Sequence, residues 1–304
     1  MSDPIVDPTA DSSAAPTADP GSAPIIVGTD GSRQARTAVA WAADDAALFG
    51  RPLRIVHAVE RWLYDIPRFP VRGTRDPLTE AGRELLADAE KLVRERRPDV
   101  DVTTEVREDE VGHALQNLAP EAFEIVLGNR GHGGFAALLV GSTGLRVAGH
   151  APGPVVIVRG EVDARRGVVV AGVDLVGDSA LALEYAFAAA AARGASVRVV
   201  HASRRAVLLA EGGYAPGVEE LEKELTSRME EVLAPWRARY PDVAVSTELT
   251  PNHPVAALVE ASQAADLLVT GAHAGGPREI RLGSVGHGVI HHAHCPVAIV
   301  RDRA

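Results

Sequence analysis

The second half of this 304-residue sequence repeats the first. The segment RIVHA (54–58) returns 144 residues later as RVVHA (198–202), and APGPVVIVR (151–159) returns 142 residues later as AHCPVAIVR (293–301). The offset therefore changes by only two residues over a whole half, which indicates a duplicated domain. Three further segments repeat in the same order: PIIVGTD, RRPDVDV and EIVLGNRG return as VVVAGVD, RYPDVAV and DLLVTGAHA.

The duplication sets the expected domain boundaries. We expect a first domain over residues 24–160 and a second over residues 161–304, with the joint near the polar stretch GEVDARRG (160–167). Residues 1–23 are rich in Pro, Ala, Ser and Asp, and such a stretch buries too little apolar surface to offset the entropy of ordering it. They are predicted to form a disordered tail.

Each half alternates short apolar runs with longer segments of helical character, which predicts an α/β fold. Buried parallel strands are apolar throughout, as IIVG, IVLG and VVIV are. Strands that alternate with helices imply a parallel sheet with right-handed crossovers and helices on both faces. In the first half we expect strands at 25–28, 53–59, 100–106, 124–128 and 154–158, and helices at 36–49, 78–97, 113–122 and 142–150, the second of them opened by Thr79.

Composition and charge exclude several classes of function. The net charge of −10 argues against broad binding to nucleic acid or to an anionic membrane, since both need a basic surface. The longest apolar stretch (181–192) is too short to span a bilayer, and no secretion signal is recognisable at the N-terminus. A single cysteine, Cys295, excludes an internal disulfide framework and suits a reducing compartment. We therefore expect a cytoplasmic protein.

The segment GNRGHGGFAALLVGST (128–143) carries the most informative glycines. Parallel α/β sheets bind ligands beyond the carboxyl ends of their strands, where strand order reverses, and the first and fourth strands usually flank that point. Glycine lets backbone approach a ligand closely, and the predicted helix that opens at Ser142 favours an anion at its start. Spacing alone leaves two interpretations open: a cradle for phosphate, to which Arg130 adds charge, or a turn.

The motif resembles the nucleotide-binding signature of the universal stress protein family. That signature is two glycines separated by two residues, then nine residues, then glycine followed by serine or threonine; Gly128, Gly131, Gly141 and Ser142 match it in full. VGTDGS, the Trp41-Ala42 pair and the twice-repeated PVVIV-type strand fit the same family. The layout is similar to the tandem, two-domain type found in actinobacteria, and the likeness covers nearly everything after residue 23.

The resemblance implies two tandem Rossmann-like domains of the adenine nucleotide alpha hydrolase-like type, each with a five-stranded parallel sheet. It also implies ATP, with or without Mg²⁺, between the first and fourth strands. On this basis the first-half nucleotide contacts are Gly28, Thr29, Asp30, Ala58, Gly128, Arg130, Gly131, Gly141, Ser142 and Thr143. No catalytic or metal-binding residue is expected, because no general base pairs with an obvious nucleophile in the sequence. Asp30, expected on the adenine or ribose, has an alternative role as the N-cap of the first helix.

The second half departs from the signature. Ala274 stands where the second glycine belongs, the Gly283-Ser284 pair comes one residue early, and Leu175-Val176 replaces a Gly-Ser pair after the acidic residue. Whether this half binds nucleotide stays open. The equivalent contacts would be Val173, Asp174, Ala202, Gly271, His273, Gly283, Ser284 and Val285.

The leading functional hypothesis is a nucleotide-dependent regulator of stress response or growth arrest, not an enzyme. The alternatives are slow ATP hydrolysis at the same crevice and a cyclic AMP sensor. In this family the last strand of each domain forms an edge where two domains pair. We therefore expect an internal pseudo-dimer of the two halves, doubled into a homodimer, and a protein partner that the sequence does not identify.

Other candidate sites have simpler explanations. GVDLVGDS (172–179) has the glycine spacing of a phosphate loop, but Asp178 occupies the lysine position and would repel phosphate. The HHAHC cluster (291–295) lies at a predicted helix end, where histidine is favoured without any metal. His57 and His201 end equivalent strands and are interpreted as structural or pocket-lining. The long loops 60–78 and 203–218 are expected to be lids or contact surfaces.

Overall fold

A computed structural model describes residues 23–60, 77–131, 140–160, 162, 165–175, 177, 179–203, 215–272 and 282–302. The predicted tail, apart from its last residue, and most of the two long loops lie outside these ranges, so neither interpretation is tested. No helix within these ranges is long and apolar enough to cross a membrane.

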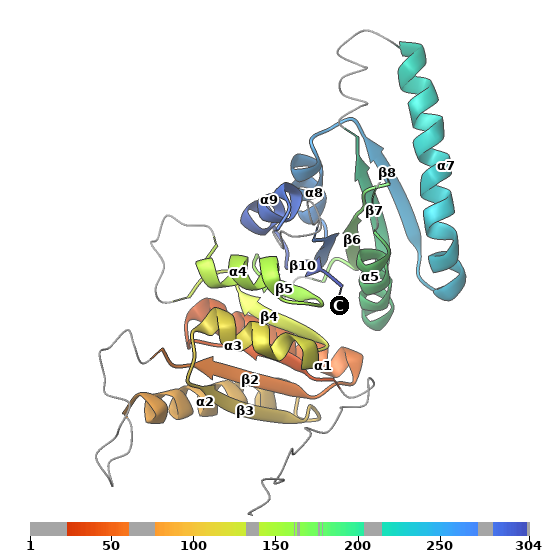
Figure 1. Cartoon of the computed structure of the whole chain (residues 1–304). Helices are drawn as coiled ribbons and strands as arrows, with labels where there is room; N and C mark the ends of the chain where they lie inside the picture. Colours follow the sequence, from red (N-terminus) through yellow and green to blue (C-terminus); the bar gives the residue numbers. More distant parts are fainter. Residues whose placement is uncertain are drawn as a thin grey trace, which may run out of the picture.

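The two halves share one ten-stranded sheet (Figure 1). Its strand order is β3-β2-β1-β4-β5-β10-β9-β6-β7-β8. Neighbouring strands are parallel except at the centre, where β5 and β10 run antiparallel. Each half therefore contributes the predicted five parallel strands. The strands are β1 (Ile25–Gly28), β2 (Leu53–Ala58), β3 (Val102–Arg107), β4 (Glu124–Gly128), β5 (Val155–Val158), β6 (Val168–Gly172), β7 (Ser196–Ala202), β8 (Val245–Thr250), β9 (Leu267–Gly271) and β10 (Val297–Val300).

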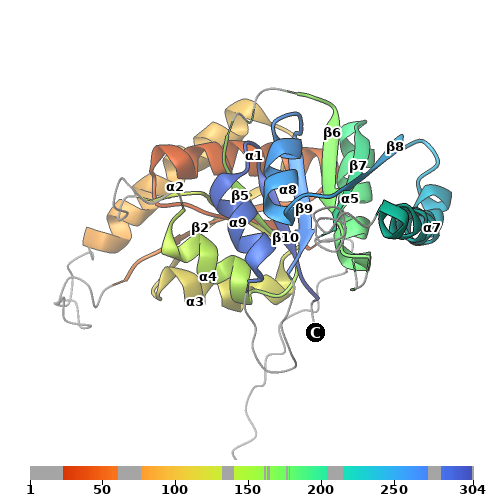
Figure 2. The ribbon, with the colours of Figure 1, turned by 90° about the horizontal axis from the view of Figure 1, so that it is seen from above.

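Helices cover both faces of this sheet (Figure 2). Successive strand residues are buried against opposite helix layers, so both faces are apolar. One layer contains α1 (Arg33–Phe49), α2 (Pro77–Arg96), α5 (Ala180–Arg193) and α7 (Ala215–Arg239). The other contains α3 (Val111–Leu118), α4 (Ser142–His150), α8 (Pro254–Ser262) and α9 (Ser284–His292), with a 3-10 turn, η2 (Ala119–Glu121), after α3.

The ends of the helices follow local sequence signals. The side chain of Ser32 accepts a hydrogen bond from the N–H of Ala35 and so caps α1. Gly50 ends α1 in the left-handed conformation (φ +61°), which glycine adopts without strain. Three predicted starts were wrong: α1 begins at Arg33 rather than at residue 36, α2 begins at Pro77 rather than Thr79, because proline is well suited to a first helical turn, and α3 begins at Val111 rather than at residue 113.

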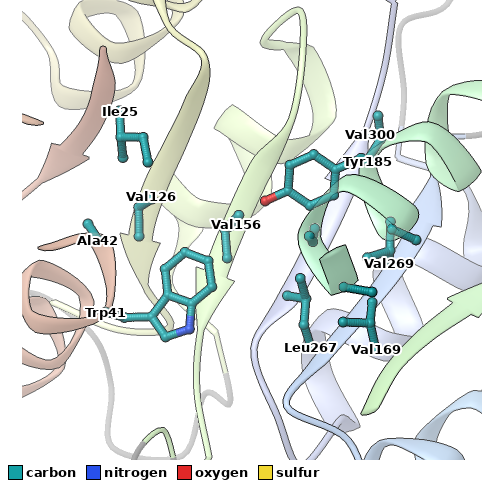
Figure 3. Close-up of a cluster of buried hydrophobic side chains, with 14 of the residues drawn as sticks. Ile25, Trp41, Ala42, Val126, Val156, Val169, Tyr185, Leu267, Val269 and Val300 are labelled. Carbon is teal, nitrogen blue, oxygen red and sulfur yellow. The ribbon is translucent and has the colours of Figure 1, made fainter. Parts of the chain in front are cut away.

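The pairing of β5 with β10 joins the halves, as the expected internal pseudo-dimer requires. Val155, Val156 and Ile157 lie opposite Ile299, Ala298 and Val297. Apolar side chains from both halves then pack across this seam, where Figure 3 shows Val156 between Trp41 of α1 and Tyr185 of α5. The seam thus closes the edge that each half would otherwise expose.

Four polar side chains are buried in this apolar seam. Arg193 of α5 forms an ion pair with Asp45 of α1, and the hydroxyl of Tyr185 donates to Oε2 of Glu124 at 2.5 Å. The other oxygens of the two carboxyl groups, Oδ2 of Asp45 and Oε1 of Glu124, have no hydrogen-bond partner among the described residues. The two carboxyl groups lie close enough to influence each other's protonation. Burial, and next the charge of Asp45, raises the pKa of Glu124 to about 8.

We expect the free energy of unfolding to fall as the pH rises from 4.5, the ordinary pKa of Glu124, to about 8. The folded chain holds a proton that the unfolded chain has lost in this range, so each pH unit costs at most about 1.4 kcal/mol. Glu124→Gln, which keeps a neutral hydrogen-bonding side chain, should remove this component. Urea unfolding over the pH range measures it. Exposed Glu121→Gln is the control, and equal slopes for Glu124→Gln and wild type would contradict the assignment.

Candidate functional site

The site predicted in the first half lies where β1 and β4 are neighbours. Ile25 pairs with Glu124 and Val27 with Val126, so the carboxyl ends of both strands meet at one edge of the sheet. Strand β2 lies on one side of this pair and β5 on the other, so strand order reverses here. The loops after Gly28 and Gly128 therefore converge, as the sequence predicts.

The loop after β1 is held by its own side chains. The Oγ1 atom of Thr29 accepts from the N–H of Gly31 at 3.3 Å, and Oδ1 of Asp30 accepts from the N–H of Ser32 at 3.0 Å. Asp30 is therefore not the N-cap of α1, and that alternative is wrong: Ser32 is the cap. The carboxylate of Asp30 instead turns its Oδ2 atom toward Gly131.

Two glycines of the motif lie against other parts of the site. A Cβ added to Gly131 would collide with Oδ2 of Asp30, and one added to Gly128 would lie 2.8 Å from the backbone carbonyl group of Gln34. The backbone after β4 thus packs directly on the start of α1 and on the acidic loop. At Gly128 the neighbour is backbone that cannot easily move, so only glycine allows this approach, whereas at Gly131 an added methyl group would displace the carboxylate of Asp30.

The third glycine opens helix α4. Gly141 is the N-cap, and it has no side chain to accept a hydrogen bond from the first turn. Its own N–H donates to the carbonyl of Asn129 at 2.8 Å, which ties the start of α4 to the end of β4. Ser142 is exposed and Thr143 half-buried in the first turn. An uncapped helix start beside Arg130 is suited to an anion.

The residues at the end of β2 support the same loop. Nδ1 of His57 donates to the carbonyl oxygen of Thr29 at 2.8 Å, and Gly82 of α2 leaves room for the imidazole ring. Ala58, the last residue of β2, is half-buried beside them. A cavity of about 60 Å³ lies between this loop and helices α1 and α2, lined by Thr29, Gly31 and Leu85 among others.

The second half reproduces the strand arrangement but not the packing. Nδ1 of His201 lies 3.0 Å from the carbonyl of Val173, which repeats the contact of His57. Asp174, however, is exposed, and its backbone rather than its carboxylate bonds to Ser179. A Cβ on Gly271 would meet no described atom within 4 Å. Ala202 ends β7 and Gly283 caps α9, with Ser284 and Val285 in its first turn; His273 and Ala274 lie outside the described residues.

Two other candidate groups are Cys295 and the histidines beside it. Burial raises the pKa of the Cys295 thiol to about 12, so it stays protonated near neutral pH. Within the described ranges, no group of three or more His, Cys, Asp or Glu side chains could hold a metal ion. The sequence analysis did not single out Arg159, which follows β5 and lies close to Arg130. The signal was present, since an arginine follows the last strand of both repeats.

Comparisons with known proteins identify the family. The profile of the Universal stress protein family matches residues 22–159 and again residues 166–301. The chain belongs to the universal stress protein family. The family resemblance and the tandem arrangement are thereby confirmed.

Relatives agree over nearly the whole length. A universal stress protein of Mycolicibacterium smegmatis is 34% identical over 290 residues, which covers 92% of this chain and 97% of the relative. One from Mycobacterium tuberculosis strain H37Rv is 33% identical over 287 residues, covering 91% and 97%. The crystal structure of a universal stress protein from Archaeoglobus fulgidus, 18% identical, superposes with a TM-score of 0.68 over 93% of this chain and 99% of that one. It supports the fold.

We expect Gly128→Ala to lower the free energy of unfolding by about 1–3 kcal/mol, because the added methyl group meets backbone that cannot easily move. The matched variant is Gly271→Ala at the equivalent end of β9, where the methyl group meets nothing described. Its effect should stay within about 0.5 kcal/mol. Denaturant unfolding of the two variants compares them directly, and equal losses would show that the close approach of Gly128 to α1 is unimportant.

Proposed function

We propose that this protein is a nucleotide-dependent regulator that binds ATP in its first half. The observation that carries the proposal is the convergence of Asp30, Gly131 and the uncapped start of α4 at the point where strand order reverses. A carboxylate suits the hydroxyl groups of a ribose, and a helix start suits phosphate. Membership of the universal stress protein family supports the same ligand class.

Each part of the crevice has a role in this proposal. Thr29 and Ala58 line the adenine side, and Asp30 accepts hydrogen bonds from the ribose. The backbone at Gly128 and Gly131 follows the ribose and first phosphate. The phosphates lie against the start of α4, where Gly141 leaves the helix open and Ser142, Thr143 and Arg130 supply donors. The fit rests on glycine positions that a Cβ would fill and on the buried Nε of Arg130, which has no partner among the described residues.

We infer a regulatory rather than a catalytic role from the groups around the crevice. The Nδ1 atom of His57 is engaged by Thr29, and the Cys295 thiol stays protonated near neutral pH, so neither is poised as a base or a nucleophile. Mg²⁺ would be held by the phosphates themselves and by water, as is usual for nucleotide-bound magnesium.

The second half and the oligomeric state remain predictions. Ala274 stands at the position equivalent to Gly131, and Leu175-Val176 replaces Gly31-Ser32, so we propose that the second half binds nucleotide more weakly or not at all. Both strands of the family's pairing edge are already joined within one chain, so a homodimer would have to use another surface. Light scattering measures whether such a dimer forms.

We expect Asp30→Ala and Gly131→Ala each to weaken ATP binding about tenfold or more, because a charge-assisted hydrogen bond or the shape of the phosphate loop is lost. Isothermal titration calorimetry measures affinity and stoichiometry. Asp99→Ala, an exposed acidic residue in the turn before β3, is the matched control and should bind like wild type.

Further measurements on the same protein separate the alternatives. Competition between ATP and cyclic AMP tests the preferred nucleotide, and phosphate release with Mg²⁺ tests slow hydrolysis. A stoichiometry of one that is lost in Asp30→Ala supports binding in the first half only. If Asp30→Ala and Gly131→Ala both bind ATP like wild type, the proposed site is wrong.

A further inference from the structure

Three basic side chains gather at the seam between the two halves. Arg130 follows β4, Arg159 follows β5, and His291 lies in the last turn of α9. Arg159 donates to the carbonyl oxygen of Ile290 in α9. After burial, the positive charge of Arg130 lowers the pKa of Arg159, and that of Arg159 is among the charges that lower the pKa of His291. Arg130 therefore lies near Arg159, and Arg159 lies near His291.

The topology explains why a helix of the second half reaches the first-half site. Because β10 runs antiparallel to β5, its N-terminal end lies beside the C-terminal end of β5. The end of α9, which leads into β10, is therefore carried to the edge of the sheet where the first-half loops converge. Helices α4 and α9 lie side by side in both views, and Gly149 of α4 approaches Leu282 just before α9 (Figures 1 and 2).

Each of the three basic side chains has a buried nitrogen atom without a hydrogen-bond partner among the described residues: Nε of Arg130, Nε of Arg159 and Nε2 of His291. None of the ion pairs found within the described ranges involves them. Burial, the larger cause, lowers the pKa of both Arg159 and His291, and the neighbouring positive charges add to it. The three side chains are half-buried, and a guanidinium group whose buried Nε has no partner is suited to bind an anion, to which a neutral imidazole N–H can also donate.

The anion site borders the start of α4. The Cα atom of Arg130 is the described atom nearest to a Cβ built on Gly141, at 3.8 Å. We propose that Arg159 and His291 bind the terminal phosphates of ATP together with Arg130, so that the second half supplies part of the first-half site. This inference rests on the proposed ATP site and names the residues that would distinguish a triphosphate from a monophosphate.

The histidines are present on one side of the seam only, although Arg301, like Arg159, has buried guanidinium nitrogens with no partner among the described residues. At the offset of 142 residues that relates the ends of the halves, Arg301 is equivalent to Arg159, but Gly149 is equivalent to His291 and Leu145 to His287. The equivalent site at the end of β10 therefore has the arginine, Arg301, but no histidine at either of these two positions of α4. Since phosphate bound at the first site would touch both β5 and α9, triphosphate binding would tighten the seam between the halves.

The test compares ATP with AMP on the full-length chain by isothermal titration calorimetry. Arg159→Gln should weaken ATP binding about tenfold, the loss of one charge-assisted hydrogen bond, and leave AMP binding unchanged. His291→Gln should weaken ATP binding about threefold, since one hydrogen bond from an uncharged donor is lost. Arg159→Lys should recover part of the affinity. Arg301→Gln, the same substitution at the equivalent position, should bind both nucleotides like wild type.

The outcomes separate this inference from the proposed site. If Arg159→Gln and His291→Gln bind ATP like wild type while Asp30→Ala does not, the cross-seam contact is wrong and the nucleotide site stands. If both variants weaken AMP as much as ATP, the cluster does not read the terminal phosphates. If wild type binds neither nucleotide, both proposals fail. Should Arg159→Gln unfold, as its melting temperature would reveal, His291→Gln alone decides.

Discussion

The antiparallel pairing of β5 with β10 is the contact on which the rest of this structure depends. Each half is a parallel sheet whose last strand would otherwise present unpaired N–H and C=O groups at an apolar edge. Joining Val155–Ile157 to Val297–Ile299 satisfies both edges at once and makes both faces of the ten-stranded sheet continuous. The same antiparallel direction carries the end of α9 to the first-half crevice, a position that a parallel junction would not produce.

The two halves place different residues at this seam, and these differences favour pairing of a first half with a second half over pairing of two identical halves. At an offset of 144, the position equivalent to Asp45 in the second half is Ala189, and the position equivalent to Phe49 is Arg193. The buried ion pair between Asp45 and Arg193, and the bond from Tyr185 to Glu124, therefore form only between unlike halves. A buried charge without its partner is costly, so pairing of two identical halves would be disfavoured.

Local sequence signals predicted most of the fold because they act over short distances. The five strands predicted in the first half lie within two residues of their expected bounds, the stop of α1 at Gly50 and the start of α4 at Ser142 lie as expected, and the duplication implied two matching sheets. The role of Asp30 as a helix cap was mistaken, because Ser32 two residues later competes for the same N–H groups and lies in the capping position. Residues with similar capping chemistry cannot be ranked without the backbone geometry.

The sequence by itself determined the duplication, the α/β alternation, the family and the glycines that open the first-half crevice, since all of these are written in spacing and residue type. Only the tertiary structure decided which side chains meet across the seam. Arg159 lies 131 residues from Ile290, and Glu124 lies 61 from Tyr185. Such contacts arise from strand register and helix packing, which bring distant residues together without leaving a local pattern to read.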